Sequence, residues 1–469
     1  MTRQTISRRT FLKAAGLGAA SLALPPRLAA AGAPRGQPNI VFILIDDQRW
    51  DVMSCAGHPY VKSPNLDRLA REGAMFTRAF VTTSLCSPSR ASFLTGRYAH
   101  AHGVPTNAGR DPDPQWPTFP ALLQKAGYET AFVGKWHMAG HDRPRPGFDH
   151  WVSFRGQGNY AGNTLNVNGE TVESKTYVTD DLTDRAVEWL RRKHTQPFML
   201  YLSHKAVHAN FAPAPRHANL YADVEMALNT RQDDRLDTKV RWGRYFPDKT
   251  WQSDLRRYMQ ALRAVDESVG KVLDTLDTLG LADATMVIFT SDNGYFLGEH
   301  RLWDKRAAYE PSIRIPMLVR YPPLVRAGAS IDALVLNIDL APTLLDLAGA
   351  EAPDTMQGRS WLPLARGDTA AGWRTCFLYE YFREGDARFN RPSVLAVRTA
   401  RHKYITYPDR EEAPVELYDL QADPHELANL APDPQHQETL ARLAAELERQ
   451  KKATGFRWPE SVNREGRGT

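Results

Sequence analysis

The chain has 469 residues, 59 of them basic and 54 acidic, and 42% of its residues are hydrophobic. Such a length is sufficient for one large globular domain and a smaller one. The first 31 residues contain five basic residues and no acidic one, so the remainder is close to neutral. This excludes a general electrostatic attraction for nucleic acid. Cys55, Cys86 and Cys376 are too few for a disulfide scaffold and leave at most one bridge if Cys86 is modified.

The N-terminal segment predicts export. Residues 7–13, S-R-R-T-F-L-K, form a twin-arginine motif, followed by an apolar stretch at 14–24 and three alanines at 29–31. The apolar stretch is too short to cross a bilayer about 30 Å thick as a helix, and no later stretch suggests stable membrane insertion. We expect residues 1–31 to be a signal peptide for the twin-arginine translocase, and the protein to be periplasmic or secreted. The alternatives are an uncleaved anchor and a basic amphipathic arm.

The first predicted element after this segment is a buried strand over residues 38–45, which runs directly into Asp46 and Asp47. Open α/β sheets bind their ligands at the carboxyl ends of the strands. The acidic pair therefore predicts a site for a hard cation, although such pairs in general are more often solvated turns.

Residues 83–97 predict a loop that turns directly into a short helix. Ser87 is a good N-cap, Pro88 suits the first helical position, and Gly96 is placed to end the helix. Cys86 would then lie at the helix N-terminus, where free N–H groups favour an anion, and Arg90 adds a permanent cation. This pattern predicts a nucleophile beside an anion site. The alternative is a buried cysteine before an ordinary helix.

A second strand end offers cationic side chains. The strand predicted at 130–133 runs into Gly134, Lys135, Trp136 and His137. Strand alternation directs Lys135 and His137 to the same side. Two convergent cationic donors suit the oxygens of an anion, whereas either residue alone would more often be a surface or satisfied core residue.

A third strand end completes a set of oxygen ligands. The strand predicted at 285–290 leads to Asp292 and Asn293. With Asp46 and Asp47, these residues offer three carboxylates and an amide. Hard oxygen donors select Ca²⁺ or Mg²⁺ over zinc.

The remaining sequence predicts the elements around these strand ends. Helices are expected at residues 64–72, 119–125, 180–193, 252–279, 337–349 and 434–452. Strands are expected at residues 74–81, 197–204, 317–321, 377–381, 393–399, 402–407 and 416–420. Loops over 142–169 would form a substrate rim, and the charged segment at 213–250 would be an excursion or a lid.

Five groups of residues, in order along the chain, resemble type I sulfatases of the alkaline phosphatase superfamily. They are D-D at 46–47, C-S-P-S-R at 86–90, G-K-W-H at 134–137, S-D-N-G at 291–294, and E-L-Y-D-L with D-P at 416–424. The resemblance implies an α/β fold with a large mixed β-sheet flanked by helices on both faces. It implies a catalytic domain at 36–367 and a smaller C-terminal domain, an antiparallel sheet plus a helix, at 368–469.

The resemblance implies hydrolysis of a sulfuric ester. In this family the cysteine at the place of Cys86 is oxidised to formylglycine by a formylglycine-generating enzyme. The aldehyde hydrates, one hydroxyl attacks sulfur, and the other later expels the sulfate. A hydroxyl also fits a hard-cation site better than cysteine sulfur, which independently supports the modification. The implied cation is Ca²⁺, with Mg²⁺ as the alternative, and its implied ligands are Asp46, Asp47, Cys86 as formylglycine, Asp292 and Asn293.

The same resemblance implies roles for the other site residues. The cations that would hold the sulfate charge are Arg90, Lys135 and Lys305. His208, in preference to His204, would protonate the leaving alcohol. His137 would deprotonate the second hydroxyl, and Asp292 would take the proton of the nucleophile.

The expected substrate is a sulfated carbohydrate or sulfated small molecule. Residues 309–316 look closest to glycan sulfatases of the N-acetylglucosamine-6-sulfatase type. One alternative is a phosphodiesterase or phosphonate monoester hydrolase with the same nucleophile; another is an inactive binder of sulfated glycans, if Cys86 is unmodified. Arg49 is either a further sulfate contact or a partner for Asp51. Surface charge, rather than substrate binding, is expected for Arg383, Arg398 and His402.

Overall fold

The computed structural model describes residues 36–226, 239, 251–369, 371–384, 391–410 and 412–462. The predicted signal peptide and most of the segment at 227–250 lie outside the described residues. Residues 36–469 group into one compact unit, within which the boundary at 367/368 stays a prediction. Within the described ranges, no helix is both long and apolar enough to span a membrane.

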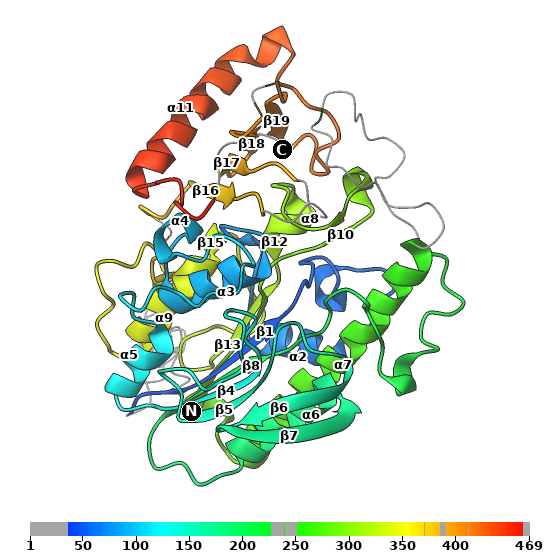
Figure 1. Cartoon of the computed structure of the whole chain (residues 1–469), viewed down its shortest axis with the longest axis vertical. Helices are drawn as coiled ribbons and strands as arrows, with labels where there is room; N and C mark the ends of the chain where they lie inside the picture. The colour runs from blue at the N-terminus through cyan, green and yellow to red at the C-terminus, as the bar shows by residue number, and fades with distance from the viewer. Residues whose placement is uncertain are drawn as a thin grey trace, which may run out of the picture. The chain divides into compact units, whose positions relative to one another are not determined.

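A ten-stranded mixed sheet organises the larger part of the chain, in the order β14-β2-β13-β9-β1-β8-β4-β5-β6-β7 (Figure 1). Its strands are β14 (Ala329–Ile331), β2 (Ala74–Phe76), β13 (Met317–Arg320), β9 (Thr285–Ser291), β1 (Asn39–Ile45), β8 (Phe198–Ser203), β4 (Glu129–Lys135), β5 (His150–Phe154), β6 (Ala161–Val167) and β7 (Glu170–Tyr177). The central strands from β9 to β5 are parallel, so their carboxyl ends meet at one edge.

Helices cover both faces of this sheet, as predicted. Alternate residues of β1 point to opposite faces. Val41 and Ile43 pack with the helices α2 (Pro64–Glu72), α6 (Val178–Leu190) and α7 (Trp251–Thr278). Ile40 and Phe42 pack with the helices α3 (Cys86–Thr95), α5 (Phe119–Lys125) and α9 (Leu340–Leu347). β1 is therefore buried on both sides, which is why its sequence is continuously apolar.

The C-terminal part forms the predicted small antiparallel sheet with a helix. Its strands are β16 (Cys376–Tyr381), β17 (Val394–Thr399), β18 (His402–Thr406) and β19 (Glu416–Asp419), in sequential order. The helix α11 (Gln437–Ala453) lies along this sheet (Figure 1) and packs on it through Leu443 and Leu447. Shorter elements are α4 (Ala99–His102), β10 (Phe296–Leu297), β11 (Trp303–Asp304), α8 (Glu310–Ile313) and α10 (Leu362–Arg366).

Two predicted segments were wrong. Residues 142–169 are not all loop, because β5 and β6 form there and β6 pairs with β7 as a hairpin. Asn168 and Gly169 both have positive φ in the hairpin turn, so the Gly- and Asn-rich composition marked tight turns rather than a long loop. Residues 74–81 are not one strand, because the chain turns after β2 and continues as β3 (Ala79–Phe80).

The strand β3 belongs to a separate three-stranded sheet with β12 (Arg314–Ile315) and β15 (Val335–Leu336). The continuous apolar pattern of the segment gives no sign of this change of sheet. All three cysteines are free, so the single disulfide that the sequence left open does not form.

Candidate active site

The candidate site lies at the carboxyl ends of the central parallel strands. Asp46 and Asp47 follow β1, Asp292 follows β9, and Lys135 ends β4. The ends lie at the same level because the backbone N–H of Asp292 donates to the carbonyl of Ile45 over 2.9 Å. Parallel pairing thus brings together residues that are more than 200 positions apart in sequence.

Carboxylate, amide and thiol groups form what we call the strand-end cluster: Asp46, Asp47, Cys86, Asp292 and Asn293. One ligand atom from each of its three carboxylates and the Cys86 Sγ all lie within 4.8 Å of one another. The Asn293 Nδ2 donates to Asp47 Oδ1 over 2.6 Å, which leaves the Asn293 Oδ1 as an acceptor. This oxygen and Asp47 Oδ2 are buried and receive no hydrogen bond.

The charge of the strand-end cluster favours a divalent cation. Burial, opposed by the charge of Lys305 and assisted by the charges of Asp46 and Asp292, raises the pKa of Asp47 to about 7. Although burial alone would raise it, the charge of Lys135 and its neighbours holds the pKa of Asp46 well below its usual value, whereas the pKa of Asp292 is raised by burial and by the charge of Asp46. A further cation would therefore favour ionisation of Asp47 and Asp292. Buried oxygens without hydrogen-bond donors, drawn from carboxylates and an amide, fit Ca²⁺ or Mg²⁺.

Three cationic side chains pair with the carboxylates of the cluster, and Arg90 lies near two of them. The Lys135 Nζ pairs with Asp46, and the Lys305 Nζ pairs with Asp47. The Arg90 Nη2 lies 2.8 Å from Asp292 Oδ2. Lys305 also reaches the Cys86 Sγ, at 3.2 Å. The predicted cations therefore surround the candidate nucleophile from three different segments.

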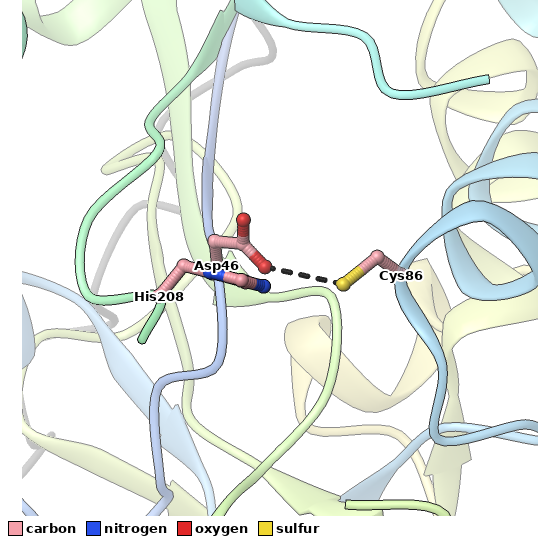
Figure 2. Close-up of side chains that lie close together, drawn as sticks. All are labelled: Asp46, Cys86 and His208. Carbon is pink, nitrogen blue, oxygen red and sulfur yellow. Dashed lines mark hydrogen bonds between the residues drawn. The ribbon is translucent and has the colours of Figure 1, made fainter. Parts of the chain in front are cut away.

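Cys86 is the first residue of α3, preceded by Leu85 in an extended conformation. The prediction that Ser87 caps the helix was wrong, because its Oγ instead donates to the carbonyl of His137 over 2.6 Å. The prediction for Gly96 was correct: it ends α3 in the left-handed conformation. The thiol of Cys86 donates to Asp46 Oδ1 over 3.4 Å (Figure 2).

The surroundings of Cys86 disfavour the thiolate. Burial raises the pKa of the Cys86 thiol well above its usual value, and the charge of Asp46 acts in the same direction. Since the thiolate is the reactive form of cysteine, the unmodified side chain is a poor nucleophile here.

Of the two histidines that follow β8, only His208 faces the strand-end cluster. Its Nε2 lies 3.8 Å from Asp47 Oδ2, and Figure 2 shows its ring beside Asp46 and Cys86. The His204 Nε2 instead pairs with the Ser268 hydroxyl of α7, at 2.9 Å. Burial lowers the pKa of His208 well below its usual value, and the nearby charge of Lys135 lowers it further.

His137 lies beyond the end of β4, near enough for the charges of Lys135 and Asp46 to act on it. It has a left-handed backbone, with φ of 58°, and its Nδ1 is buried without a hydrogen-bond partner. Burial and the charge of Lys135 lower the pKa of His137 well below its usual value. Both site histidines are therefore neutral imidazoles before an anion binds.

Two residues of the site were missed from the sequence. The Gln157 Oε1 accepts a hydrogen bond from the Lys135 Nζ, and Gln157 lies in the segment that was expected to be a substrate rim. Lys205, the second of these residues, lies between His204 and His208 in the sequence. It lies beyond the end of β8, so strand alternation does not predict the direction of its side chain.

Other candidates prove to be structural. The Arg49 side chain pairs with Asp51 and Glu299, so of the two alternatives the structure shows the partner for Asp51. The prediction that Arg398 is a surface charge was wrong, because this residue is only 4% exposed and pairs with Glu310 at 3.2 Å.

Comparison with known proteins agrees with these motifs. The family model described as Sulfatase matches residues 38–350, and the model of the C-terminal part of N-sulphoglucosamine sulphohydrolase matches residues 298–453. The N-acetylglucosamine-6-O-sulfatase of Bacteroides thetaiotaomicron is 35% identical, over 89% of this chain and 87% of the relative. The N-acetylglucosamine-6-sulfatase of Homo sapiens is 32% identical, over 86% of this chain and 82% of the relative.

Solved structures show the same fold. A protein solved in complex with its substrate D-glucosamine-2-N,6-O-disulfate superposes with a TM-score of 0.84 at 31% identity, covering 90% of this chain and 99% of that one. The phosphonate monoester hydrolase of Agrobacterium radiobacter superposes with a TM-score of 0.74 at 22% identity, covering 89% and 96%, and shows the fold alone. Because the matches to sulfatases extend over most of its length, the chain belongs to the sulfatase family.

Proposed function

We propose that this sulfatase removes a sulfate ester from the 6-position of an N-acetylglucosamine or related glucosamine unit. The observation that carries the proposal is the convergence of three carboxylates, Cys86 and three cations at one sheet edge. The named activity of the relatives from Bacteroides thetaiotaomicron and Homo sapiens supports the choice of sugar.

We further propose that the site works with Ca²⁺ and with Cys86 converted to formylglycine. Asp46, Asp47, Asp292 and Asn293 would hold the cation through the oxygens described above. When bound, the cation would supply positive charge against the sulfate oxygens, and the hydrated formylglycine would supply a hydroxyl nucleophile. The oxygen-rich surroundings of Cys86 support this conversion, because a hydroxyl suits a hard-cation site better than a thiol sulfur.

The protein's own cations would bind and orient the sulfate. Lys135 pairs with Asp46, Lys305 reaches both Asp47 and the Cys86 Sγ, and each ammonium offers a further N–H donor. Arg90 holds its neighbours in place: its Nη1 donates to the Lys135 carbonyl over 2.7 Å and to the Ser203 hydroxyl over 2.8 Å. Preorganised donors of this kind stabilise the charge that develops in the transition state.

The two histidines would transfer protons to and from the reacting groups. Asp292 would accept the proton of the nucleophile. His208 would protonate the leaving oxygen, and His137 would take the proton whose removal releases the sulfate. Since cations and burial lower the pKa of His208, it needs the negative charge of a bound sulfate to become an acid. This order of events makes protonation of His208 dependent on substrate.

The direct test is sulfate release by the purified, calcium-loaded protein from N-acetylglucosamine 6-sulfate. Comparison of 4-nitrophenyl sulfate with the matching phosphodiester separates a sulfatase from a phosphodiesterase or phosphonate monoester hydrolase. A mass spectrum of the Cys86 peptide shows whether sulfur has been replaced by an aldehyde oxygen. An unmodified Cys86 in a protein that binds sulfated glycan without turnover would support the inactive binder instead.

We also propose that the protein is exported by the twin-arginine translocase after a formylglycine-generating enzyme has acted on it in the cytosol. A relative from Drosophila melanogaster, 32% identical over 73% of this chain and 33% of its own length, is named an extracellular sulfatase. Fractionation of cells that express the wild-type chain or the Arg8→Lys/Arg9→Lys variant tests the route. Retention of only the variant in the cytoplasm is the expected result.

A further inference from the structure

Lys205 is a buried lysine at the edge of the strand-end cluster. Its side chain is only 4% exposed. The backbone beside it is fixed to the cluster, because the Asp46 N–H donates to the Ala206 carbonyl over 3.0 Å and the Val207 N–H donates to the Asp46 carbonyl over 2.8 Å. His208 donates its N–H to the Lys205 carbonyl over 3.0 Å. Lys205 and the proposed acid therefore belong to one turn of chain.

The ammonium of Lys205 has no hydrogen-bond acceptor or carboxylate partner among the residues that the structure describes. Its nearest aromatic neighbour is Tyr160, whose ring centroid lies 5.0 Å from the Lys205 Nζ. The Tyr160 hydroxyl is already engaged, since it donates to the His208 carbonyl over 2.7 Å. An aromatic face attracts a cation but accepts none of the three N–H donors in the manner of an oxygen.

The other deeply buried lysines of the described chain have hydrogen-bond or carboxylate partners. Lys239 contacts the His300 Nδ1 at 2.9 Å and donates to the Glu426 carbonyl over 2.6 Å. Lys135 and Lys305 pair with Asp46 and Asp47. Lys403 lies 2.9 Å from Glu310 and 2.6 Å from Glu426. Lys205 is the exception: most of its side chain is buried, but its Nζ is not among the enclosed atoms that lack a partner, so an anion supplied from outside could reach it at the margin of the site.

The charge balance of the site points the same way. Arg90, Lys135 and Lys305 already place three positive charges beside the three carboxylates of the strand-end cluster, and Lys205 is a further positive charge. Burial lowers the pKa of Lys205 to about 8, and the charge of Lys135 contributes to this shift. A bound anion would raise the pKa of Lys205 again, because it would favour the charged form.

We propose that Lys205 binds a second anionic group of the substrate, distinct from the ester sulfate that is cleaved. The proposal rests on the proposed function. Because Lys205 shares its segment with His208, the proposed acid toward the leaving oxygen, the anion belongs to the leaving saccharide. The substrate class is then a sulfated amino sugar with another sulfate or carboxylate. The substrate named in the structure at 31% identity carries two sulfates.

The test compares substrates that differ by one anion. Wild type, Lys205→Met and Lys205→Arg would be assayed on glucosamine N,6-disulfate, on N-acetylglucosamine 6-sulfate, and on the latter joined to glucuronic acid. Loss of one charge-assisted hydrogen bond reduces binding by about 10- to 100-fold. In Lys205→Met, the ratio of kcat/KM for the dianionic to the monoanionic substrate should fall by that factor, mainly through KM. Lys205→Arg should restore most of it.

The two dianionic substrates distinguish the anions. If the kcat/KM ratio falls only for the disulfate, the anion bound by Lys205 is a sulfate. If it falls only for the glucuronic acid conjugate, that anion is a carboxylate. Unchanged ratios for both would overturn the proposal, as would an equal loss on all three substrates. The matched control is Lys193→Met, which removes an exposed lysine beyond the end of α6 and should change neither the ratios nor the activity.

Failure of the proposed function would look different, because the wild type itself would hydrolyse none of the sulfates. In that case calorimetric titration with glucosamine N-sulfate and with glucuronate still decides. Tighter binding of either compound by wild type than by Lys205→Met supports the second-anion site, and equal affinities for both compounds reject it.

Discussion

The molecule contains two buried clusters of charged residues, and they differ in how completely their polar atoms are satisfied. The junction cluster, formed by Glu310, Arg398, Lys403 and Glu426, lies where α8 meets the C-terminal sheet and leaves no orphaned side-chain atom among those residues. The strand-end cluster leaves Asp47 Oδ2 and Asn293 Oδ1 without a donor, beside the unpaired Nδ1 of His137.

The pKa shifts of the buried carboxyl groups also differ between the two clusters. Although burial alone would raise it, Arg398 and Lys403 hold the pKa of Glu310 well below its usual range. In the strand-end cluster, burial and like charges raise the pKa of Asp47 to about 7. Burial of charge by itself therefore does not identify an active site. Incomplete satisfaction of buried charge is the more informative signal.

We expect the largest loss of activity from removal of the proposed nucleophile, Cys86. Cys86→Ala should reduce sulfate-ester turnover by on the order of 10⁶-fold, the loss seen when a hydrolase nucleophile is deleted. Because the substitution removes no ion pair, the melting temperature should stay close to that of wild type. Steady-state kinetics and thermal melts measure both. Retention of substantial activity in a pure preparation would exclude Cys86 as the nucleophile.

The junction cluster should respond in stability rather than in catalysis. Lys403→Met leaves two buried glutamates without their shared cation and should cost about 3–5 kcal/mol of unfolding free energy. The folded fraction should keep a near-normal kcat. Urea unfolding and kinetics measure the two effects, and Lys403→Met/Glu426→Gln, which removes one of the stranded charges, should recover part of the stability. A fall in kcat with unchanged stability would contradict the structural role.

Lys305 lies in the strand-end cluster and should show the opposite pattern. Lys305→Met removes a donor aimed at Cys86 and should lower kcat by about 10²–10³-fold. The stability change should be smaller than that of Lys403→Met, because all three carboxylates of the cluster remain available to protonate or to bind a cation. If the two lysine variants lost stability and activity in equal measure, the distinction between the clusters would fail.

The smallest effect concerns a paired histidine remote from the site. Burial alone would lower the pKa of His100, but Glu380, with its Oε2 2.7 Å from the His100 Nδ1, outweighs this and raises it. Its contribution to stability is therefore complete below the unfolded pKa of about 6.5 and is lost as the pH rises through the higher folded value. Unfolding curves of wild type and His100→Gln should differ most below pH 6 and converge in alkali. A constant difference across pH would argue against a charged pair.

The strand-end cluster was largely predictable from sequence, for a physical reason. Asp46, Asp292 and Lys135 each follow an apolar run, and parallel pairing brings such strand ends to a common edge. The same reasoning could not reveal that Lys205 lacks a partner, because this depends on where every carboxylate of the described fold lies.

Local sequence patterns could not predict the junction cluster or the strand pairings at the edges of the sheets. Glu310 and Glu426 are 116 residues apart in sequence, and no strand-end motif marks either of them. The hairpin of β6 and β7 was missed because its turn residues suggested loops. The division of residues 74–81 between two sheets was missed because a buried apolar segment reads the same in either sheet.

We propose that the strand-end cluster is a calcium-dependent sulfatase site. The most direct measurement is ion-chromatographic detection of sulfate released from N-acetylglucosamine 6-sulfate by wild-type protein whose Cys86 is fully converted to formylglycine. We predict release with calcium present, and loss of release on chelation that calcium restores. Absence of release from such protein, or release indifferent to chelation, would contradict the claim.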